Sequence, residues 1–280
     1  MKIWLNGSLS DENASYVLAH NAGSLLGWGV FSTIGIVNGR ATWLERHFRR
    51  LRHDAAALDL VFSEEDEVLF SALTELIQAN DVQNGLARLT VTARGDNRWN
   101  HASGYDLSIL AISAPAAPLH NLKLCLSPHR LDARRPLAGI KSTSYAPHQW
   151  LWHAAQQQGF DEAVVLNQKG IVCEGARSNL FWVRKNELFT PETSTGCLPG
   201  IGREIILGWA RERGWNVHEG SFSLLELEAA DEVFLTTATT GPRSVALFAT
   251  QSTLNHANQY PSPGPMTEEL QHRWQTTRTT

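Results

Sequence analysis

The spacing of apolar residues along the chain alternates between the two-residue repeat of strands and the three- to four-residue repeat of helices. Residues 30–37 are mostly apolar, and the turn-forming pair Asn38-Gly39 separates them from residues 40–43. This pattern predicts a strand, a hairpin turn and a second strand. Apolar side chains then recur every three or four positions over residues 44–58, so we expect a helix there.

The same signals continue to the end of the chain. Ser63 is a candidate N-cap for a second helix, because acidic residues and an apolar helical face follow it. Further helices are expected over residues 145–158, 203–213 and 266–274, and strands over residues 1–5, 86–92, 107–112, 122–126, 163–166, 171–174, 180–183, 187–190 and 232–235. This mixture, with no repeat of fixed period, is typical of the α/β or α+β class.

A run rich in proline and alanine, Ala114-Pro115-Ala116-Ala117-Pro118, interrupts the pattern. Such composition is typical of linkers between domains. We therefore expect a small N-terminal α/β domain over residues 1–114, an interdomain linker over residues 115–119 and a larger C-terminal domain over residues 120–280.

Composition narrows the range of functions. At 280 residues and 42% hydrophobic content, the chain can bury a sizeable core, and a net charge of −4 with scattered basic residues disfavours nucleic-acid binding. The three cysteines are widely spaced and lie near no histidine pair, which predicts neither disulfides nor a metal site. No apolar stretch approaches the roughly 20 residues of a membrane span, and the N-terminus lacks a signal-peptide pattern. We expect a globular cytoplasmic protein without membrane contact.

Three separate motifs contain residues that suit one cofactor. Lys141 lies between a loop and a helix in Gly-Ile-Lys-Ser-Thr-Ser-Tyr, Glu174 ends an apolar strand, and residues 198–203 form a glycine-rich turn that opens a helix. Pyridoxal phosphate requires an amine for a Schiff base, a carboxylate to keep its pyridine nitrogen protonated, and backbone N–H groups for its phosphate. On local sequence alone, an ordinary solvated lysine is the more common interpretation of Lys141.

Together with Arg50 in His47-Phe-Arg-Arg50-Leu51, the order and spacing of these motifs resemble the class IV, or fold-type IV, pyridoxal-phosphate enzymes. This family includes branched-chain and D-amino acid aminotransferases and aminodeoxychorismate lyase. The resemblance covers about residues 27–245 and implies a two-domain fold-type IV protein whose larger C-terminal domain binds pyridoxal 5'-phosphate. It also implies a homodimer with the site near the interface.

The resemblance gives each motif a role. Lys141 would form the Schiff base and move protons at the substrate carbon, Glu174 would contact the pyridine nitrogen, and Arg50 would bind the phosphate. Further cofactor-binding residues implied by the family pattern are Tyr145, Ser178, Asn179, Leu198, Ile201, Gly202 and Thr239.

Two positions depart from the family pattern. Gly202 and Ala238 stand where many relatives have threonine. Hydroxyl bonds to phosphate would then be lost, unless Thr237, Thr239 or Thr240 provides them.

The segment Phe31-Ser32-Thr33 bears on the choice among the family's reactions. Aminotransferases of this class usually have glutamate directly after the aromatic residue, whereas aminodeoxychorismate lyases resemble Phe-Ser-Thr. The resemblance therefore predicts a 4-amino-4-deoxychorismate lyase of folate biosynthesis, in which catalytic Thr33 assists the departure of pyruvate and leaves 4-aminobenzoate. The alternative is an aminotransferase that acts on D-amino acids or branched-chain L-amino acids with 2-oxoglutarate.

Both reactions need a small-molecule substrate with amino and carboxylate groups. Ser144 and Tyr145 point in opposite directions, because lyases often have asparagine at the first position and some aminotransferases have tyrosine at the second. Candidate substrate-binding residues are Phe31, Arg88, Arg94, Arg98 and Thr240, and the sequence does not decide which arginine binds the carboxylate.

Overall fold

A computed structural model describes residues 1–14, 17, 19–95, 102–115, 120–250 and 257–278. The chain divides into two compact units. The first comprises Met1–Ala117 and Ile140–Tyr145, and the second comprises Pro118–Gly139 and Ala146–Arg278. Of the predicted linker over residues 115–119, residues 116–119 lie outside the described residues.

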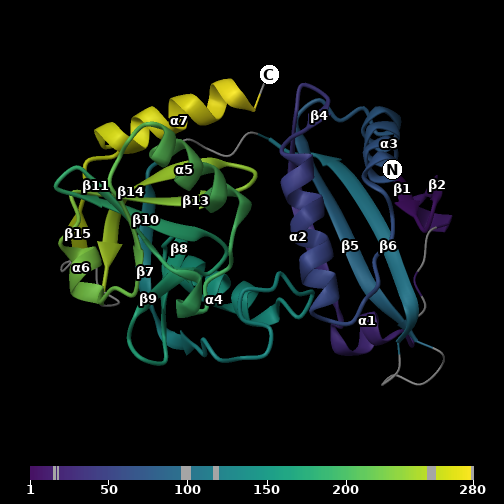
Figure 1. Ribbon diagram of the computed structural model, residues 1–280, viewed down its shortest axis with the longest axis horizontal. Helices are drawn as coiled ribbons and strands as arrows, with labels where there is room; N and C mark the ends of the chain where they lie inside the picture. Colours follow the sequence, from purple (N-terminus) through teal and green to yellow (C-terminus); the bar gives the residue numbers. More distant parts are fainter. Residues whose placement is uncertain (15–16, 18, 96–101, 116–119, 251–256, 279–280) are drawn as a thin grey trace. The chain divides into compact units, whose positions relative to one another are not determined.

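The first unit is built on a six-stranded antiparallel sheet with the strand order β2-β1-β6-β5-β3-β4 (Figure 1). Its helices pack on this sheet, α2 against β3 and α3 against β1 and β6. The elements are β1 (Lys2–Leu5), β2 (Ser8–Asp11), a 3-10 turn (Glu12–Ala14), α1 (Ala22–Leu26), β3 (Gly29–Val37), β4 (Arg40–Ala41), α2 (Leu44–Ala56), α3 (Asp66–Ala79), β5 (Gly85–Gly95) and β6 (Ala102–Ser113).

The helical spacing seen in the sequence is the buried face of α2. Phe48, Leu51 and Ala55 are 2% exposed or less, so the stripe faces the sheet as an amphipathic helix requires. The expected N-cap of the next helix is wrong. Helix α3 begins at Asp66 with Glu65 as its N-cap, because the Ser63 hydroxyl instead hydrogen-bonds the Tyr105 hydroxyl at 3.3 Å.

The segment around Lys141 pairs with the outer edge of β3. Strand β4 pairs only with Ile36 and Val37 at one end of that edge. At the other end, Phe31 N donates to Lys141 O at 3.0 Å and Thr143 N donates to Gly29 O at 2.8 Å. The predicted division placed this segment in the C-terminal domain, whereas it clusters with the first unit. The physical reason is that it satisfies backbone groups that an edge strand would otherwise leave unpaired.

The second unit contains a mixed nine-stranded sheet with the order β12-β11-β10-β13-β14-β7-β8-β9, in which β15 pairs with β14. The neighbours β11/β12, β14/β7 and β7/β8 are parallel. The elements are β7 (Leu122–Leu131), α4 (Ala146–Gln157), β8 (Glu162–Asn167), β9 (Val172–Gly175), β10 (Asn179–Arg184), β11 (Glu187–Pro191), a 3-10 turn (Thr193–Thr195), α5 (Ile201–Glu212), β12 (Val217–Gly220), α6 (Leu224–Glu228), β13 (Glu232–Thr237), β14 (Gly241–Ala249), β15 (Ala257–Gln259) and α7 (Pro265–Thr277).

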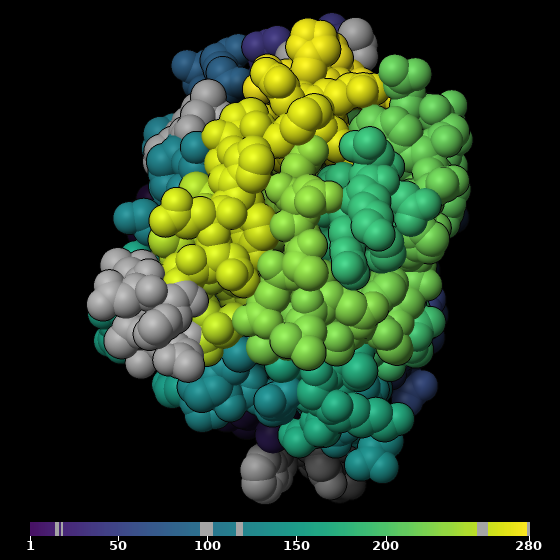
Figure 2. Space-filling model, turned by 90° about the vertical axis from the view of Figure 1, so that its left-hand side faces the viewer, coloured from purple at the N-terminus to yellow at the C-terminus, as the bar shows by residue number. Residues whose placement is uncertain are grey.

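Helices α5 and α7 cover part of this sheet. Helix α5 packs on β13, and α7 packs on β13 and β14. In Figure 2 the side chains of α7 form a continuous yellow band beside light-green parts of the same unit. The two helices meet through the rings of Trp209 and Trp274, 5.9 Å apart, and through an ion pair between Arg213 and Glu269. Among the described residues, no helix has the length and hydrophobicity to cross a membrane.

Candidate active site

Lys141 lies among aromatic rings in the first unit. Its Nζ atom is 4.7 Å from the centre of the Phe31 ring and 5.0 Å from the centre of the Tyr145 ring. The two rings meet edge to face at 5.3 Å, and the backbone N–H of Lys141 donates to Asp54 Oδ2 at 3.2 Å. The lysine side chain is therefore held against ring faces, unlike that of an ordinary solvated lysine.

Arg88 contacts the same aromatic group. Its guanidinium carbon is 3.7 Å from the centre of the Phe31 ring, and its backbone pairs with that of Thr33 across β3 and β5. Alternation along a strand places Phe31 and Thr33 on one face. Burial lowers the pKa of Arg88, with the nearby Tyr145 opposing this effect, yet a guanidinium stays charged in proteins. No carboxylate of the described part of the chain forms a salt bridge with Arg88.

Arg94 has a different environment. Its Nε and Nη2 atoms both donate to Asp106 Oδ1, at 2.9 and 2.6 Å. Asp106 is 6% exposed and also accepts from the amides of Asn6 and Asn21. Arg94 thus belongs to a network that ties β5 to β6 and to the N-terminal segments. Arg98, the third candidate, lies outside the described residues.

Arg50 belongs to a buried polar group between β3 and α2. Its Nη2 atom donates to Ser32 Oγ at 2.8 Å, and Ser32 Oγ lies 2.8 Å from His47 Nδ1. Arg50 Nε lies 3.9 Å from Asp54 Oδ2. The sequence analysis gave no role to His47 or Asp54. The signal that could have found them is their spacing, because residues 47, 50 and 54 share one face of a helix.

Glu174 and Leu198 are connected in the second unit. Glu174 is the second-last residue of β9 and is 4% exposed, and its Oε2 atom accepts from the backbone N–H of Leu198 at 2.9 Å. The amide of Asn179 donates to Leu198 O at 2.7 Å. Gly200 allows this packing, because a Cβ atom there would overlap the Asn179 side chain. A buried carboxylate and the start of the glycine-rich turn are thus fixed beside each other.

Ser178 contacts a second buried carboxylate. Its hydroxyl donates to Glu162 Oε2 at 3.3 Å. Burial raises the pKa of Glu162 to about 7, and the positive charge of Arg177 opposes the rise. The sequence analysis did not single out Glu162, and a glutamate at the start of a strand gives no signal of burial.

The N-terminus of α5 lies against the end of β13, directly before the turn that leads to β14. Ile201 and Gly202 open this helix, and its N-cap Gly200 provides no side-chain cap. The first N–H groups are therefore available to an anion. A Cβ atom on Gly202 would lie 2.7 Å from Thr236 Oγ1 and 2.8 Å from Thr237 O. The glycine thus permits a close approach that threonine would prevent without a shift.

The same turn is rich in hydroxyls. Thr237 Oγ1 accepts from the N–H groups of Thr239 and Thr240, at 3.3 and 3.1 Å, and lies within 3.1 Å of both their hydroxyls. Thr236 Oγ1 is buried and has no hydrogen-bond partner among the described residues. Hydroxyls beside an uncapped helix N-terminus fit a phosphate group.

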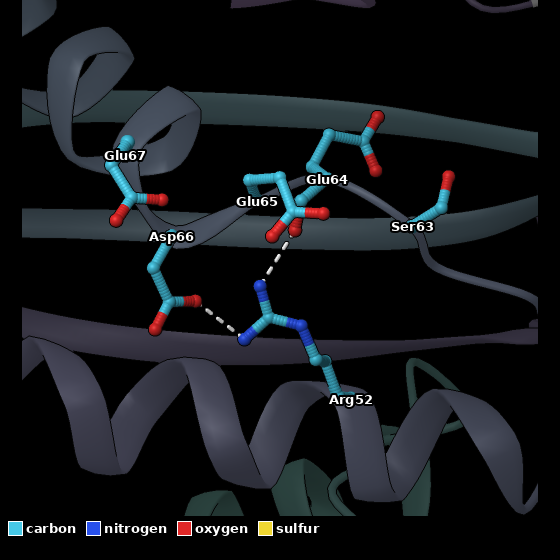
Figure 3. Close-up of a pocket in the computed structure, with 6 residues that line it drawn as sticks. All are labelled: Arg52, Ser63, Glu64, Glu65, Asp66 and Glu67. Atoms are coloured by element: carbon cyan, nitrogen blue, oxygen red, sulfur yellow. Dashed lines mark hydrogen bonds and ion pairs between the residues drawn. The ribbon is translucent and has the colours of Figure 1, made fainter.

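A surface pocket of the first unit differs from these sites in charge. It is lined by Arg52 and Ser63–Glu67, and four of its side chains are carboxylates (Figure 3). Its guanidinium is already engaged by Asp66 Oδ1 at 2.5 Å and by Glu64 O at 2.6 Å. The remaining negative charge would repel a phosphate or a carboxylate, so this pocket does not suit the predicted ligands.

The first unit therefore brings together Phe31, Thr33, Arg88, Lys141 and Tyr145, and it places Arg50 beside Ser32. The second unit brings Glu174, Asn179, Leu198, Ile201 and Gly202 together, with Ser178 beside Asn179 and with Thr239 and Thr240 on the neighbouring turn. Arg94 is paired with Asp106 instead. The predicted roles of these side chains stay predictions.

Known proteins similar to this chain agree with the family resemblance. Residues 29–248 match the family model described as amino-transferase class IV. The chain is 31% identical to D-alanine aminotransferase of Bacillus licheniformis, over 97% of this chain and 95% of that protein. It is 28% identical to aminodeoxychorismate lyase of Bacillus subtilis, over 84% of this chain and 82% of that protein. The holo, PLP-form structure of branched-chain amino acid aminotransferase from Thermobaculum terrenum superposes with a TM-score of 0.86 at 25% identity, covering 99% and 93% of the two chains.

Proposed function

Because the chain belongs to the class IV aminotransferase family, whose cofactor is pyridoxal 5'-phosphate, we propose that it is an aminotransferase. It would move an amino group from a D-amino acid or a branched-chain L-amino acid to a 2-oxo acid. The sequence analysis preferred the lyase reaction. The aminotransferase is favoured here because similar proteins over nearly the full chain, such as the D-alanine enzyme, are aminotransferases.

The residues of each unit fit the cofactor. When bound, pyridoxal 5'-phosphate supplies an aldehyde that reacts with amines and a ring that withdraws electrons from the substrate's α-carbon. The buried carboxylate of Glu174 would hold a proton at the pyridine nitrogen. The uncapped start of α5 and Arg50 would bind the phosphate oxygens. Glycine at position 202 gives that helix start its close approach to the threonine-rich turn.

Lys141 would act at the substrate. Its amine would hold the cofactor by bonding to the aldehyde carbon with loss of water, and it would be set free when the substrate's amino group takes its place. The free amine would then take the proton from the substrate's α-carbon and return it at the carbon that bore the aldehyde. The rings of Phe31 and Tyr145 restrict the lysine side chain from two sides.

The structural observation that supports a substrate with a carboxylate is the position of Arg88. Its guanidinium is stacked on the ring that also contacts Lys141, and it has no acidic partner among the described residues. A substrate carboxylate would be the acidic partner of Arg88, because arginine binds carboxylates through two parallel hydrogen bonds. Arg94 is less suited to this role, since Asp106 already occupies its guanidinium.

A half-reaction tests the proposal. Holoenzyme is mixed with D-alanine or L-leucine, without a 2-oxo acid, and the absorbance of the cofactor is followed. An aminotransferase converts its cofactor once to the pyridoxamine form and regenerates the aldehyde form only when 2-oxoglutarate is added. The preferred donor identifies the enantiomer. A lack of conversion with any amino acid would refute the proposal.

The lyase is the second candidate, and Thr33 is the residue that supports it. Its hydroxyl lies on the Phe31 face of β3 opposite Arg88, where it could donate a proton to a leaving group. Ser32, the other half of the sequence argument, is directed toward α2 and engaged there. Release of 4-aminobenzoate and pyruvate in equal amounts from 4-amino-4-deoxychorismate, without a 2-oxo acid, would replace the aminotransferase by the lyase.

Two further parts of the proposal concern the protein's state. We propose a cytoplasmic homodimer with the site near the interface, on the basis of the family resemblance. Light scattering of the purified protein tests the dimer, because a monomeric mass at micromolar concentration would contradict it. Cell fractionation tests the location.

A further inference from the structure

Ser32 occupies an unusual place for a strand serine. It is 0% exposed in the middle of β3, and its hydroxyl lies 2.8 Å from two partners on α2, His47 Nδ1 and Arg50 Nη2. A buried hydroxyl needs only one partner to avoid a desolvation penalty. Two partners of different kinds indicate a directed chain of hydrogen bonds.

The direction of this chain follows from the donors. The guanidinium of Arg50 can only donate, so Ser32 Oγ accepts from it. The hydroxyl hydrogen of Ser32 then has His47 Nδ1 as its acceptor, which requires a neutral imidazole protonated at Nε2. Burial lowers the pKa of His47 well below its ordinary value, and the charges of Arg50 and Lys141 lower it further. His47 therefore stays neutral and keeps accepting.

The cost of this arrangement argues against a purely structural role for His47. The side chain is 0% exposed, and its Nε2 atom has no hydrogen-bond partner among the described residues. A buried polar atom without a partner costs about 1–3 kcal/mol. A leucine would fill the space without that cost, so the imidazole is explained by its contact with Ser32.

These hydrogen bonds of Ser32 do not neutralise the positive charge of Arg50. Ser32 is a neutral acceptor, and the ion pair between Arg50 Nε and Asp54 Oδ2 is long, at 3.9 Å. That carboxylate has other partners, the His53 ring at 3.2 Å and the backbone N–H of Lys141 at 3.2 Å. A guanidinium oriented by a hydroxyl retains more attraction for a dianion than one oriented by an acid.

We propose that Ser32 and His47 are positioning residues that orient Arg50 toward the phosphate of the cofactor. The inference rests on the proposed function, which gives Arg50 the phosphate. Neither residue touches the ligand. His47 fixes the hydroxyl of Ser32, and Ser32 fixes one edge of the guanidinium, so that its other N–H groups face the anion without an ordering penalty.

Titration of the apoprotein with two ligands tests the inference. Pyridoxal 5'-phosphate and pyridoxal differ only in the phosphate, and binding is followed by cofactor absorbance and tryptophan fluorescence. Ser32→Ala is expected to raise the Kd for pyridoxal 5'-phosphate roughly three- to tenfold and to leave the Kd for pyridoxal unchanged. Arg50→Ala should raise the first Kd by about 10- to 100-fold. In the Arg50→Ala background, Ser32→Ala should add nothing.

Conservative variants separate positioning from general damage. Ser32→Thr retains the hydroxyl and should keep the parent Kd within about twofold. His47→Asn places an amide oxygen near the position of Nδ1 and should weaken binding less than His47→Leu does. Thr42→Val is the matched control, because it removes another buried hydroxyl of this unit, one that bonds Gly35 O instead. Thermal unfolding of each apoprotein confirms that the variant is folded.

The outcomes distinguish a failure of the positioning role from a failure of the proposed function. If Arg50→Ala weakens phosphate-dependent binding and Ser32→Ala does not, the positioning role is wrong and the proposed function stands. If Arg50→Ala has no effect, the assignment of Arg50 to the phosphate falls, and the positioning role falls with it. Equal loss of affinity for both ligands in a folded Ser32→Ala protein, or a folded Ser32→Thr protein that binds like Ser32→Ala, would overturn the role of the hydroxyl.

Discussion

Gly202→Ala should destabilise the second unit, although alanine is the better helix former. The added methyl carbon would lie 2.7 Å from Thr236 Oγ1 and 2.8 Å from Thr237 O, well inside the separation of about 3.5 Å at which atoms attract. Both obstacles are buried or part of a strand, so neither can turn away freely. Overpacking of this kind costs about 1–3 kcal/mol, and the helical preference of alanine offsets at most about 1 kcal/mol.

Helix α5 offers a matched control for this substitution. Gly208 lies in the same helix, and a Cβ atom there would meet nothing within 4 Å. Gly208→Ala should therefore stabilise the protein by about 0.5–1 kcal/mol. Each kcal/mol corresponds to about 2–4 °C in Tm for a domain of this size. The two alanine variants should thus move Tm in opposite directions when the apoproteins are heated.

The binding of pyridoxal 5'-phosphate provides the second measurement. Gly202→Ala pushes the start of α5 away from the β13–β14 turn, so its Kd for the cofactor should rise, whereas Gly208→Ala should keep the parent Kd. Combining Gly202→Ala with Thr236→Ala removes one of the two obstacles and should recover part of the lost stability. A Gly202→Ala protein as stable as Gly208→Ala, with the parent Kd, would refute the close-approach reasoning.

Three other predictions concern single side chains. Lys141→Ala should abolish the absorbance of lysine-bound cofactor and all turnover, and a cofactor adduct that borohydride still fixes to this variant would contradict the assignment. Arg88→Leu keeps an apolar side chain over Phe31 but loses the charge, so KM for amino acids should rise at least tenfold through loss of a charge-assisted bond of about 1.5–3 kcal/mol. The Kd for the cofactor should not change, and an unchanged KM would exclude Arg88 as the carboxylate site. The pKa of Glu162 is raised to about 7, so the folded state binds a proton that the unfolded state has lost, and stability falls as pH rises from the ordinary carboxyl pKa of about 4.5 to about 7. Glu162→Gln should remove this loss, up to about 3 kcal/mol above pH 7, and urea unfolding curves at pH 5 and 8 that change in parallel for variant and parent would contradict the shift.

Local sequence patterns predicted the elements whose structure is determined by residues close together in the chain. The hairpin of β3 and β4 follows from Asn38-Gly39, and α2 follows from the spacing of its apolar residues. Strand β14 was missed, because Pro242 lies at its start and a bulge between Val245 and Leu247 breaks the alternation of its side chains. The fold-type IV architecture came from the resemblance and agrees with the match to solved structures.

The candidate site was predictable only where a motif named it. The sequence motifs predicted Lys141, Glu174 and Arg50 as site residues but could not show that Arg94 is occupied, because its partner Asp106 lies on the next strand. The sequence analysis also treated Gly202 as a lost hydroxyl, whereas a Cβ atom at this position would lie too close to Thr236 and Thr237, so glycine is needed for steric reasons. Such contacts depend on residues far apart in the chain, which spacing alone does not encode.

The pairing of the Lys141 segment with β3 has a consequence for recombination between relatives. The first unit is assembled from two stretches of chain, Met1–Ala117 and Ile140–Tyr145. A chimera made by a single crossover near residue 117 would join the β3 edge of one parent to the lysine segment of the other. The codons for the first unit are therefore discontinuous in the gene. Exchange of this unit between relatives requires that both segments come from the same parent.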